Sequence, residues 1–288
     1  RLDDEDTGRK MYLEGHLPGA VYLDLNRDLS SKAGKHGGAH PLPDFPTFIQ
    51  KLANIGIDRE TTVVIYDDGN DMFAARLWGL LEAIGLKKVY ILEGGYNRWV
   101  EEGNEVTTEL PTLKPKKLKA KFDESKIVDM ETVRDKLDSD TVIIDSRAEE
   151  RYLGDYEPLY SKAGHIPGAV NYPWQKVLSE DGQWLKGDAL QKHFATLDKS
   201  VEIIVSCGSG VSACVNILAL KAAGFKNVKL YPGSFSDWIS YDENDIEIGE
   251  NHIVLLSSGN KMIMNKGASA PNILTVIFAN RQFIGMNA

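Results

Sequence analysis

The sequence predicts an α/β protein made of two homologous domains, each a mainly parallel sheet flanked by helices. Three observations lead to this prediction. Short apolar runs rich in β-branched residues alternate with longer amphipathic runs, which is the pattern of βαβ units. The motif Gly-His-[Leu/Ile]-Pro-Gly-Ala-Val occurs twice, at 15–21 and at 164–170. The length of 288 residues suits two domains of ordinary size.

The duplication extends beyond this motif. The spacing between the two copies is 149 residues at His16 and His165, and 139 residues at Trp99 and Trp238. The first half therefore carries about ten extra residues, which we place in the Gly- and His-rich loop 33–40. Two copies with so long a period predict two homologous domains rather than a solenoid.

The second half contains the more complete set of elements. Each expected strand is a short apolar run, and each expected helix is a longer amphipathic one. Strands are expected at 141–145, 169–172, 201–205 and 228–231, and helices near 130–137, 187–195, 211–223 and 234–241. The first half has no run in the place of 142–147, so we expect its first strand to be missing.

These elements divide the chain into four segments. They are a first domain at 1–104, a Pro- and Lys-rich extended linker at 105–122, a second domain at 123–249 and a tail at 250–288. The tail contains two strand-like runs, 253–256 and 272–278, and has no counterpart in the first half. The sequence assigns it no role.

Composition excludes several classes of function. The formal net charge of −9 offers no basic surface for nucleic acid, and no apolar run approaches the length of a membrane span. Cys207 and Cys214 form neither a disulfide framework nor a metal-ligand pattern. His36 and His40 lack a third ligand, so we expect no metal and no other cofactor, and we interpret both as loop residues. Two unpaired cysteines favour a reducing compartment, so a cytoplasmic location is expected.

Cys207 is the strongest candidate for catalysis because it follows the strand expected at 201–205. The residues after it, Gly208-Ser209-Gly210-Val211-Ser212, are small and lead into the helix expected at 211–223. Such a turn directs backbone N–H groups and the positive end of the helix dipole at the sulfur, which stabilises the nucleophilic thiolate. Cys214 lies among apolar residues of that helix and is expected to be buried.

The paired Gly-His motifs, Asp145-Ser146-Arg147, the Cys207 loop and two Gly-x4-Trp endings together resemble the tandem-domain rhodanese family of sulfurtransferases. The resemblance covers residues 1–249. It implies that the second domain carries the active cysteine and that the first is an inactive copy. The sequence agrees, because Asp67 takes the place of the cysteine in the first half, and a carboxylate cannot accept a sulfane sulfur.

The resemblance implies that a sulfur atom moves through a persulfide on Cys207. It would pass from a small-molecule donor to a thiol, such as thioredoxin, or to cyanide. The loop form Cys-Gly-Ser-Gly-Val-[Ser/Thr] is similar to that of 3-mercaptopyruvate sulfurtransferases, whereas family members that use thiosulfate carry basic residues there. We therefore expect 3-mercaptopyruvate as the donor and keep thiosulfate as the alternative. A persulfide carrier without turnover is a further alternative. A phosphatase is disfavoured because the loop has no arginine to stabilise a phosphoryl group.

The resemblance also implies roles for single side chains. Arg151 would hold the substrate carboxylate, since a guanidinium offers two parallel donors. Ser209 would assist proton transfer. The other loop residues expected to contact the substrate are Gly208, Gly210, Val211 and Ser212.

Two arginine positions need separate comment. Arg147 is expected to be a structural partner of Asp145 rather than a substrate ligand. The subfamily has a second arginine after the pair Glu157-Pro158, and this chain has none there. Tyr160 or Lys162 is the candidate to replace it, although a lysine lacks the fork geometry.

His16 and His165 occupy equivalent turns in the two halves. Their presence in both halves favours a structural role, with the ring hydrogen-bonded to the backbone. The alternative for His16 is a supporting role in the active site. It would then face the cysteine loop across the domain interface and form a proton relay with Asp4 or Asp6.

Overall fold

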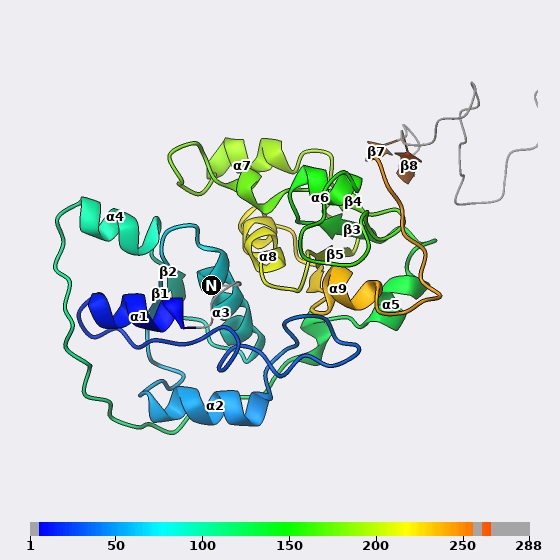
Figure 1. Ribbon diagram of the computed structural model, residues 1–288. Helices are drawn as coiled ribbons and strands as arrows, with labels where there is room; N and C mark the ends of the chain where they lie inside the picture. Colours follow the sequence, from blue (N-terminus) through cyan, green and yellow to red (C-terminus); the bar gives the residue numbers. More distant parts are fainter. Residues whose placement is uncertain (1–5, 256–260, 266–288) are drawn as a thin grey trace, which may run out of the picture.

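Two parallel sheets of different size organise the two lobes of the chain (Figure 1). The computed structural model of the protein describes residues 6–255 and 261–265. The elements of the first lobe are α1 (Thr7–Glu14), α2 (Phe45–Asn54), β1 (Val63–Ile65), α3 (Met72–Ala83), β2 (Val89–Ile91) and α4 (Gly95–Glu101). No helix in the described ranges is long and apolar enough to cross a membrane.

The second lobe begins after an extended linker and contains the larger sheet. Its strands are β3 (Val142–Asp145), β4 (Val170–Asn171), β5 (Ile203–Ser206) and β6 (Val228–Leu230). Its helices are η1 (Glu124–Lys126), α5 (Met130–Asp135), α6 (Glu149–Leu153), η2 (Trp174–Val177), α7 (Gly187–His193), α8 (Ala213–Ala222) and α9 (Ser234–Trp238). The four strands and four helices expected from the sequence are confirmed.

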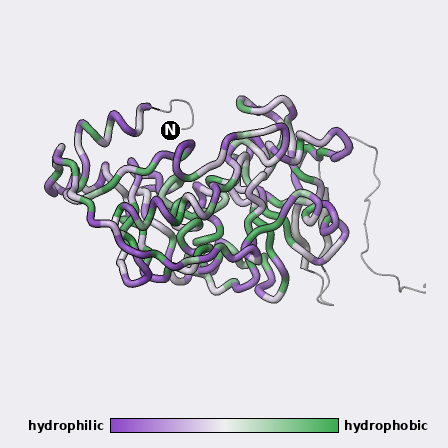
Figure 2. Tube along the Cα trace, turned by 90° about the horizontal axis from the view of Figure 1, so that it is seen from below, coloured by the Kyte–Doolittle hydropathy of each residue, from purple (hydrophilic) through white to green (hydrophobic). Residues whose placement is uncertain are grey.

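The sheet of the second lobe has the order β4-β3-β5-β6 with every neighbouring pair parallel. Successive side chains of a strand point to opposite faces, and both faces are covered here. Ile203 and Val205 of β5 pack in the cluster formed with α7 and α8, whereas Ile204 packs with α5 and α9. Figure 2 shows the apolar segments gathered inside the lobes and the hydrophilic ones on the outer loops.

The sheet of the first lobe consists, over the described residues, of β1 paired in parallel with β2. Ile65 and its neighbour Val63 pack against α2 and α3 in one cluster. Val64 points to the opposite face and is 57% exposed, whereas Ile204, its counterpart on β5, is fully buried. No described segment takes the place of β3 in this lobe.

The linker, expected at 105–122, is extended and follows the surface of the first lobe. Thr107 forms an antiparallel bridge with His16, and the N–H group of Lys116 donates to Ala53 in α2. Phe122 stacks on Phe45, and Leu118 packs on the first-lobe core. These contacts fix the path of the chain between the lobes.

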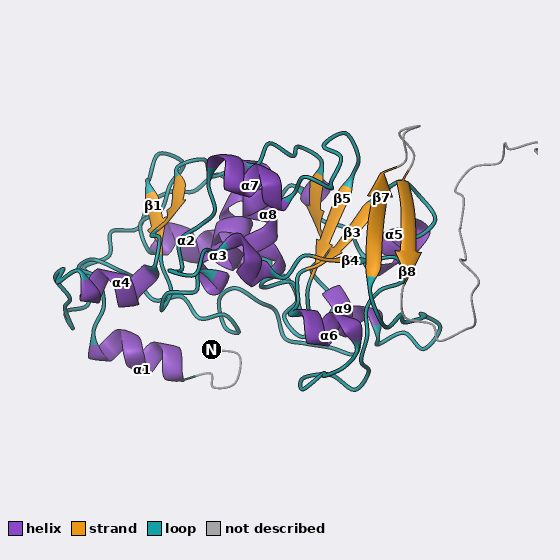
Figure 3. Cartoon of the chain, turned by 90° about the horizontal axis from the view of Figure 1, so that it is seen from above, coloured by secondary structure: helices purple, strands orange, loops and turns teal. Residues whose placement is uncertain are grey.

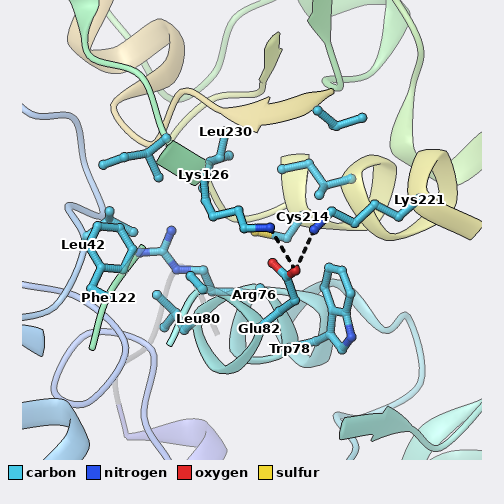
Figure 4. A pocket seen from close by; sticks show the side chains of 15 residues that line it. Leu42, Arg76, Trp78, Leu80, Glu82, Phe122, Lys126, Cys214, Lys221 and Leu230 are labelled. Carbon is cyan, nitrogen blue, oxygen red and sulfur yellow. Dashed lines mark hydrogen bonds and ion pairs between the residues drawn. The ribbon is translucent and has the colours of Figure 1, made fainter. Parts of the chain in front are cut away.

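The interface between the lobes is formed mainly by α3 and α8, which lie side by side (Figure 1). At its edge the carboxylate of Glu82 on α3 binds Lys126 and Lys221 of the second lobe (Figure 4). The loop at 33–40 also crosses the interface. The N–H group of Gly37 donates to Asp237 of α9.

The tail begins with an antiparallel hairpin of β7 (Asn251–Leu255) and β8 (Lys261–Asn265). Figure 3 shows it beside the second-lobe sheet, on the β4 side. The strand expected at 253–256 overlaps β7. The run at 272–278 lies outside the described residues.

We predict that Gly38→Ala disrupts the docking of the loop at 33–40. Gly38 has φ +83°, and a Cβ atom there would lie 2.4 Å from the carbonyl oxygen of Gly233. Gly103 has φ +75° but open space around it, so Gly103→Ala is the matched control. Both substitutions should cost about 1 kcal/mol for the left-handed backbone. Gly38→Ala should lower the free energy of unfolding, measured in urea, by about 1 kcal/mol more than Gly103→Ala does, because of the backbone clash. Equal effects of the two substitutions would contradict the close approach.

Candidate active site

Cys207 lies directly after β5, at the carboxyl edge of the sheet, and is 2% exposed. Its Sγ atom accepts a hydrogen bond of 3.1 Å from the N–H group of Gly210. Its own N–H group donates to the hydroxyl of Ser234 at 3.0 Å, and its carbonyl accepts from Phe235. The strand end and α9 thus fix the sulfur in a loop that directs a backbone donor at it.

Two glycines allow the loop to close around the sulfur. Gly210 has φ +75°, and a Cβ atom there would lie 2.3 Å from the carbonyl oxygen of Pro232. A Cβ atom on Gly208 would lie 2.7 Å from the hydroxyl of Tyr160. A side chain at either position would therefore displace the donor or the tyrosine.

Ser234 is a component of the site that sequence reasoning missed. It holds φ +54°, a conformation that costs a non-glycine residue about 1–2 kcal/mol. Gly95, its counterpart in the first lobe, has the same φ of +54° without this cost. The signal was available, since one repeat has Gly where the other has Ser. The hydroxyl of Ser234 bonds the backbone of Cys207 and of Tyr231.

Arg76 of α3 reaches the loop from the first lobe and is fully buried. Its guanidinium donates to the carbonyl oxygen of Gly210 at 3.0 Å, and to the carbonyls of Leu29, His40 and Pro41. Sequence analysis missed this residue, because nothing in an amphipathic helix marks an arginine that crosses an interface. Its charge lies close enough to Cys207 for a direct electrostatic interaction.

His40 contacts the cysteine loop, contrary to its interpretation as a plain loop residue. Its Nδ1 atom lies 2.7 Å from the hydroxyl oxygen of Ser209. Burial, and secondarily the charge of Arg76, lowers the pKa of His40 from 6.5 to about 4, so the ring is neutral at pH 7. The hydroxyl of Tyr160 is also within hydrogen-bonding reach of Ser209. Ser209 therefore lies between a neutral imidazole and a phenol.

Two arginines share one buried carboxylate near the loop. Arg147 forms an ion pair with Asp145 and a second one with Glu157. Arg151 donates to both oxygens of Glu157 through Nε and Nη2, which leaves its Nη1 edge available to a ligand. The guanidinium of Arg151 lies 5.5 Å from the ring centre of Tyr160, whose hydroxyl lies beside Gly208 of the loop.

Among the remaining residues Val211 differs from expectation, whereas Cys214 is buried as expected. Val211 is 2% exposed, and its side chain packs in the core of the first lobe, so only its backbone remains for a ligand. Ser212 is the N-cap residue of α8, and its side chain makes no capping hydrogen bond. Cys214 is buried in α8, and burial raises the pKa of its thiol to about 12, so it remains protonated.

His16 does not join the cysteine loop, so the alternative of a proton relay is wrong. Its Nδ1 and Nε2 atoms lie 2.6 Å and 3.0 Å from the carbonyl oxygens of Tyr12 and Glu109. Asp6 pairs with Arg27, and Asp4 lies outside the described residues. His165 in the second lobe likewise bonds a backbone carbonyl, which supports the structural role of both histidines.

Asp67 occupies the place of the cysteine in the first lobe. Its two carboxylate oxygens accept hydrogen bonds from four backbone N–H groups. The donors are Gly69, Asp71, Phe73 and Ala74. Both lobes therefore present backbone donors at the end of the equivalent strand, but the first lobe fills them with a permanent carboxylate.

No cluster of potential metal ligands occurs among the residues that the structure describes. Both cysteines are free thiols. The groups at the site that can take part in a reaction are the thiol of Cys207, the N–H group of Gly210, the hydroxyl of Ser209 and the Nη1 group of Arg151.

The comparisons with known proteins agree with this geometry. A family model described as "Rhodanese-like domain" matches residues 1–102 and 115–241. The chain is 38% identical over 255 residues to a probable 3-mercaptopyruvate sulfurtransferase of Pseudomonas aeruginosa, covering 86% of this chain and 90% of that protein. It is 34% identical over 239 residues to the thiosulfate sulfurtransferase of Bos taurus, with 80% and 79% covered.

Solved structures give the same result. The crystal structure of SseA from Escherichia coli, described among 3-mercaptopyruvate sulfotransferases, matches with a TM-score of 0.69 and 34% identity. The match covers 79% of this chain and 86% of that one.

We predict that His40 makes the protein less stable in acid. Because its pKa is about 4 in the folded protein and 6.5 in the unfolded chain, the unfolded chain takes up a proton first as the pH falls below 6.5. Between pH 7 and pH 5 this should remove up to about 2 kcal/mol from the free energy of unfolding.

His40→Gln should lose correspondingly less stability over the same pH interval, as measured by urea unfolding at each pH. His36→Gln, in the same loop but exposed, is the matched control. Its free energy of unfolding should change with pH as that of the wild type does. Parallel slopes for His40→Gln and the wild type would show that the buried position of His40 is wrong.

Proposed function

Because the chain belongs to the rhodanese family, we propose that it is a sulfurtransferase in which Cys207 carries the transferred sulfur as a persulfide. The observation that carries this proposal is the position of its Sγ atom, which accepts the N–H group of Gly210 at the carboxyl end of β5. The first lobe has Asp67 at the equivalent place, so the proposed chemistry belongs to the second lobe alone.

The proposed reaction has two displacement steps. The Cys207 thiolate attacks the sulfur of 3-mercaptopyruvate, and an S–S bond forms as the C–S bond breaks. The electron pair of that bond leaves on carbon as the enolate of pyruvate, which takes up one proton. An acceptor thiolate or cyanide then attacks the outer sulfur, and the electron pair of the S–S bond returns to Cys207.

Ser209 is the proposed proton relay for the departing enolate. Its hydroxyl lies between neutral His40 and the phenol of Tyr160, and all three can exchange protons without a charged intermediate. The N–H group of Gly210 serves the anionic sulfur in both steps. Arg76 keeps that N–H group in place because it holds the carbonyl of the same residue.

The balance of charge favours 3-mercaptopyruvate over thiosulfate. Arg147 and Arg151 are matched by the buried carboxylates Asp145 and Glu157. Arg76 has no carboxylate partner, but it is fully buried and its guanidinium is bonded to backbone carbonyls rather than open to a dianion. The free Nη1 edge of Arg151 suits one carboxylate. Thiosulfate stays the alternative, since relatives with that activity cover a similar part of the chain.

The acceptor in this proposal is a thiol, with thioredoxin as one candidate, or cyanide. Both cysteines are free, which agrees with a reducing compartment, and we retain the cytoplasm as the proposed location. A carrier that holds a persulfide without turnover remains distinguishable, because it would take up one sulfur per chain and stop.

We predict that steady-state kcat/KM is at least tenfold higher for 3-mercaptopyruvate than for thiosulfate, about 1.4 kcal/mol of transition-state discrimination. Arg151→Lys should raise KM for 3-mercaptopyruvate, because lysine cannot bind Glu157 and a substrate carboxylate together. Arg134→Lys, whose side chain pairs with Glu243 on the surface, is the matched control. Cys207→Ala is the blank.

A preference for thiosulfate would refute the donor assignment while leaving sulfur transfer intact. Turnover in Cys207→Ala would refute the mechanism. Uptake of one sulfur per chain without turnover with any of these acceptors would favour the carrier.

We predict that the hydroxyl of Ser234 contributes to activity, while the backbone conformation of this residue lowers the free energy of unfolding. Ser234→Ala and Ser234→Gly both remove the hydrogen bond to the N–H group of Cys207 and should lower kcat/KM by a similar factor. Ser234→Gly should unfold with a free energy about 1 kcal/mol higher than Ser234→Ala, because glycine adopts φ +54° without strain. Unchanged kcat/KM in both variants would argue against a role for the hydroxyl.

A further inference from the structure

The carboxylate of Glu157 lies between two guanidinium groups, and its side chain is only 2% exposed. Its Oε2 atom accepts hydrogen bonds of 3.1 Å from Nη1 of Arg147 and from Nε of Arg151. Both of its oxygens accept from Nη2 of Arg151, at 2.8 Å and 3.0 Å. The N–H group of Leu159 donates to Oε1 at 3.0 Å. Groups of the chain itself thus occupy both oxygens, so Glu157 can act on a ligand only through the arginines.

The turn after α6 brings Glu157 back to the side chain of Arg151. Gly154 ends α6 with φ +88°. The N–H groups of Asp155 and Tyr156 then both donate to the carbonyl oxygen of Glu150. The chain reverses here, and two residues that are six positions apart form an ion pair. The pair is therefore built within one short segment of the second lobe.

Glu157 determines the net charge of this group of side chains. Arg147 pairs with Asp145 and with Glu157, whereas Arg151 pairs with Glu157. Two positive charges and two negative charges therefore cancel. Without the charge of Glu157 the group would carry one net positive charge. Arg151 would then have no carboxylate partner among the described residues.

This charge lies beside the proposed reaction centre. The guanidinium of Arg151 is 5.5 Å from the ring centre of Tyr160, whose hydroxyl lies beside Gly208. Arg147 and Tyr160 are both close enough to Cys207 for a direct electrostatic interaction. A ligand that reaches from the cysteine to Arg151 would therefore be affected by the net charge of the group. Because Coulomb energy is proportional to charge, a dianion gains about twice as much as a monoanion from each added positive charge.

We propose that Glu157 makes the site select a singly charged sulfur donor over a doubly charged one, an inference that rests on the proposed function. Its charge cancels the excess that would attract the dianion of thiosulfate. Its bonds to Nε and Nη2 of Arg151 leave the Nη1 edge for the single carboxylate of 3-mercaptopyruvate. Glu157 is a positioning residue in this proposal, because it contacts the arginines and not the substrate.

The test compares the two donors in charge variants of the full chain. Glu157→Gln keeps the size of the side chain and one acceptor oxygen but removes the charge. The ratio of kcat/KM for thiosulfate to kcat/KM for 3-mercaptopyruvate should rise by at least about tenfold. Glu157→Asp keeps the charge, so its ratio should stay within about threefold of the wild type. Glu150→Gln removes an exposed charge of α6 and is the matched control, with an unchanged ratio.

A binding measurement examines the same selection without turnover. In the Cys207→Ala background, sulfate serves as the dianion and pyruvate as the monoanion, and both are titrated by calorimetry. Adding Glu157→Gln should strengthen sulfate binding relative to pyruvate binding by at least about tenfold, and less so as the ionic strength rises to about 1 M.

The loss of a buried partner can lower the stability of Glu157→Gln. The rise in melting temperature with sulfate and with pyruvate then gives the same comparison, because an anion that binds only the folded chain stabilises it. A general loss of structure would lower both activities together and would not move the ratio toward the dianion.

Two results would overturn the inference. The first is a donor ratio and a sulfate preference that Glu157→Gln leaves unchanged. The second is an equal change in Glu157→Asp and Glu157→Gln, which would show that shape and not charge decides. Turnover with an unchanged ratio would refute the role of Glu157 and leave sulfur transfer intact. A wild type that turns over neither donor would refute the proposed function, while the binding measurement would still decide on Glu157.

Discussion

The buried guanidinium of Arg76 is the interaction on which the arrangement of the two lobes depends. It has no carboxylate among its hydrogen-bond partners, which are backbone carbonyls of the first lobe and Gly210 of the second. A buried charge is tolerated only when hydrogen bonds replace the lost water. Separation of the lobes would remove the carbonyl of Gly210, the partner that the second lobe supplies, and water would have to replace it. The lobes are therefore fixed in one relative position at the cysteine loop.

The two lobes use the same loop geometry for different anions. In the first, four N–H groups surround the carboxylate of Asp67, which is part of the chain and cannot leave. In the second, the donor from Gly210 faces the sulfur of Cys207, whose charge changes during the proposed cycle. At the next turn the second lobe has Ser234 where the first has Gly95. Ser234 has a strained backbone conformation, and its hydroxyl bonds the N–H group of Cys207. The first lobe thus uses its backbone donors to hold a side chain in place, whereas the second lobe directs one at a sulfur that can react.

The sequence was sufficient for features that depend on local pattern. Strand and helix order, the duplication and the loop around Cys207 all followed from periodicity and from glycine positions. It was insufficient for contacts between lobes, because these depend on how two surfaces meet. Arg76 and His40 are far from Cys207 along the chain, and neither residue type signals an interface. The prediction for Val211 was wrong for the same reason. Sequence analysis assigned this loop valine to the substrate, but its side chain packs in the core of the other lobe.

The contacts between lobes also explain why an inactive first domain remains useful to the second. The first half is longer than the second by about ten residues, and the comparison of the two halves places most of them in the loop at 33–40. That loop supplies the ring of His40 to Ser209, and its neighbours Gly37 and Ala39 bond α9. The segment that distinguishes the first half from the second is thus the segment that completes the second half's site. The first lobe thus has a carboxylate in place of the nucleophile and contributes its loop to the wall of the second lobe's site.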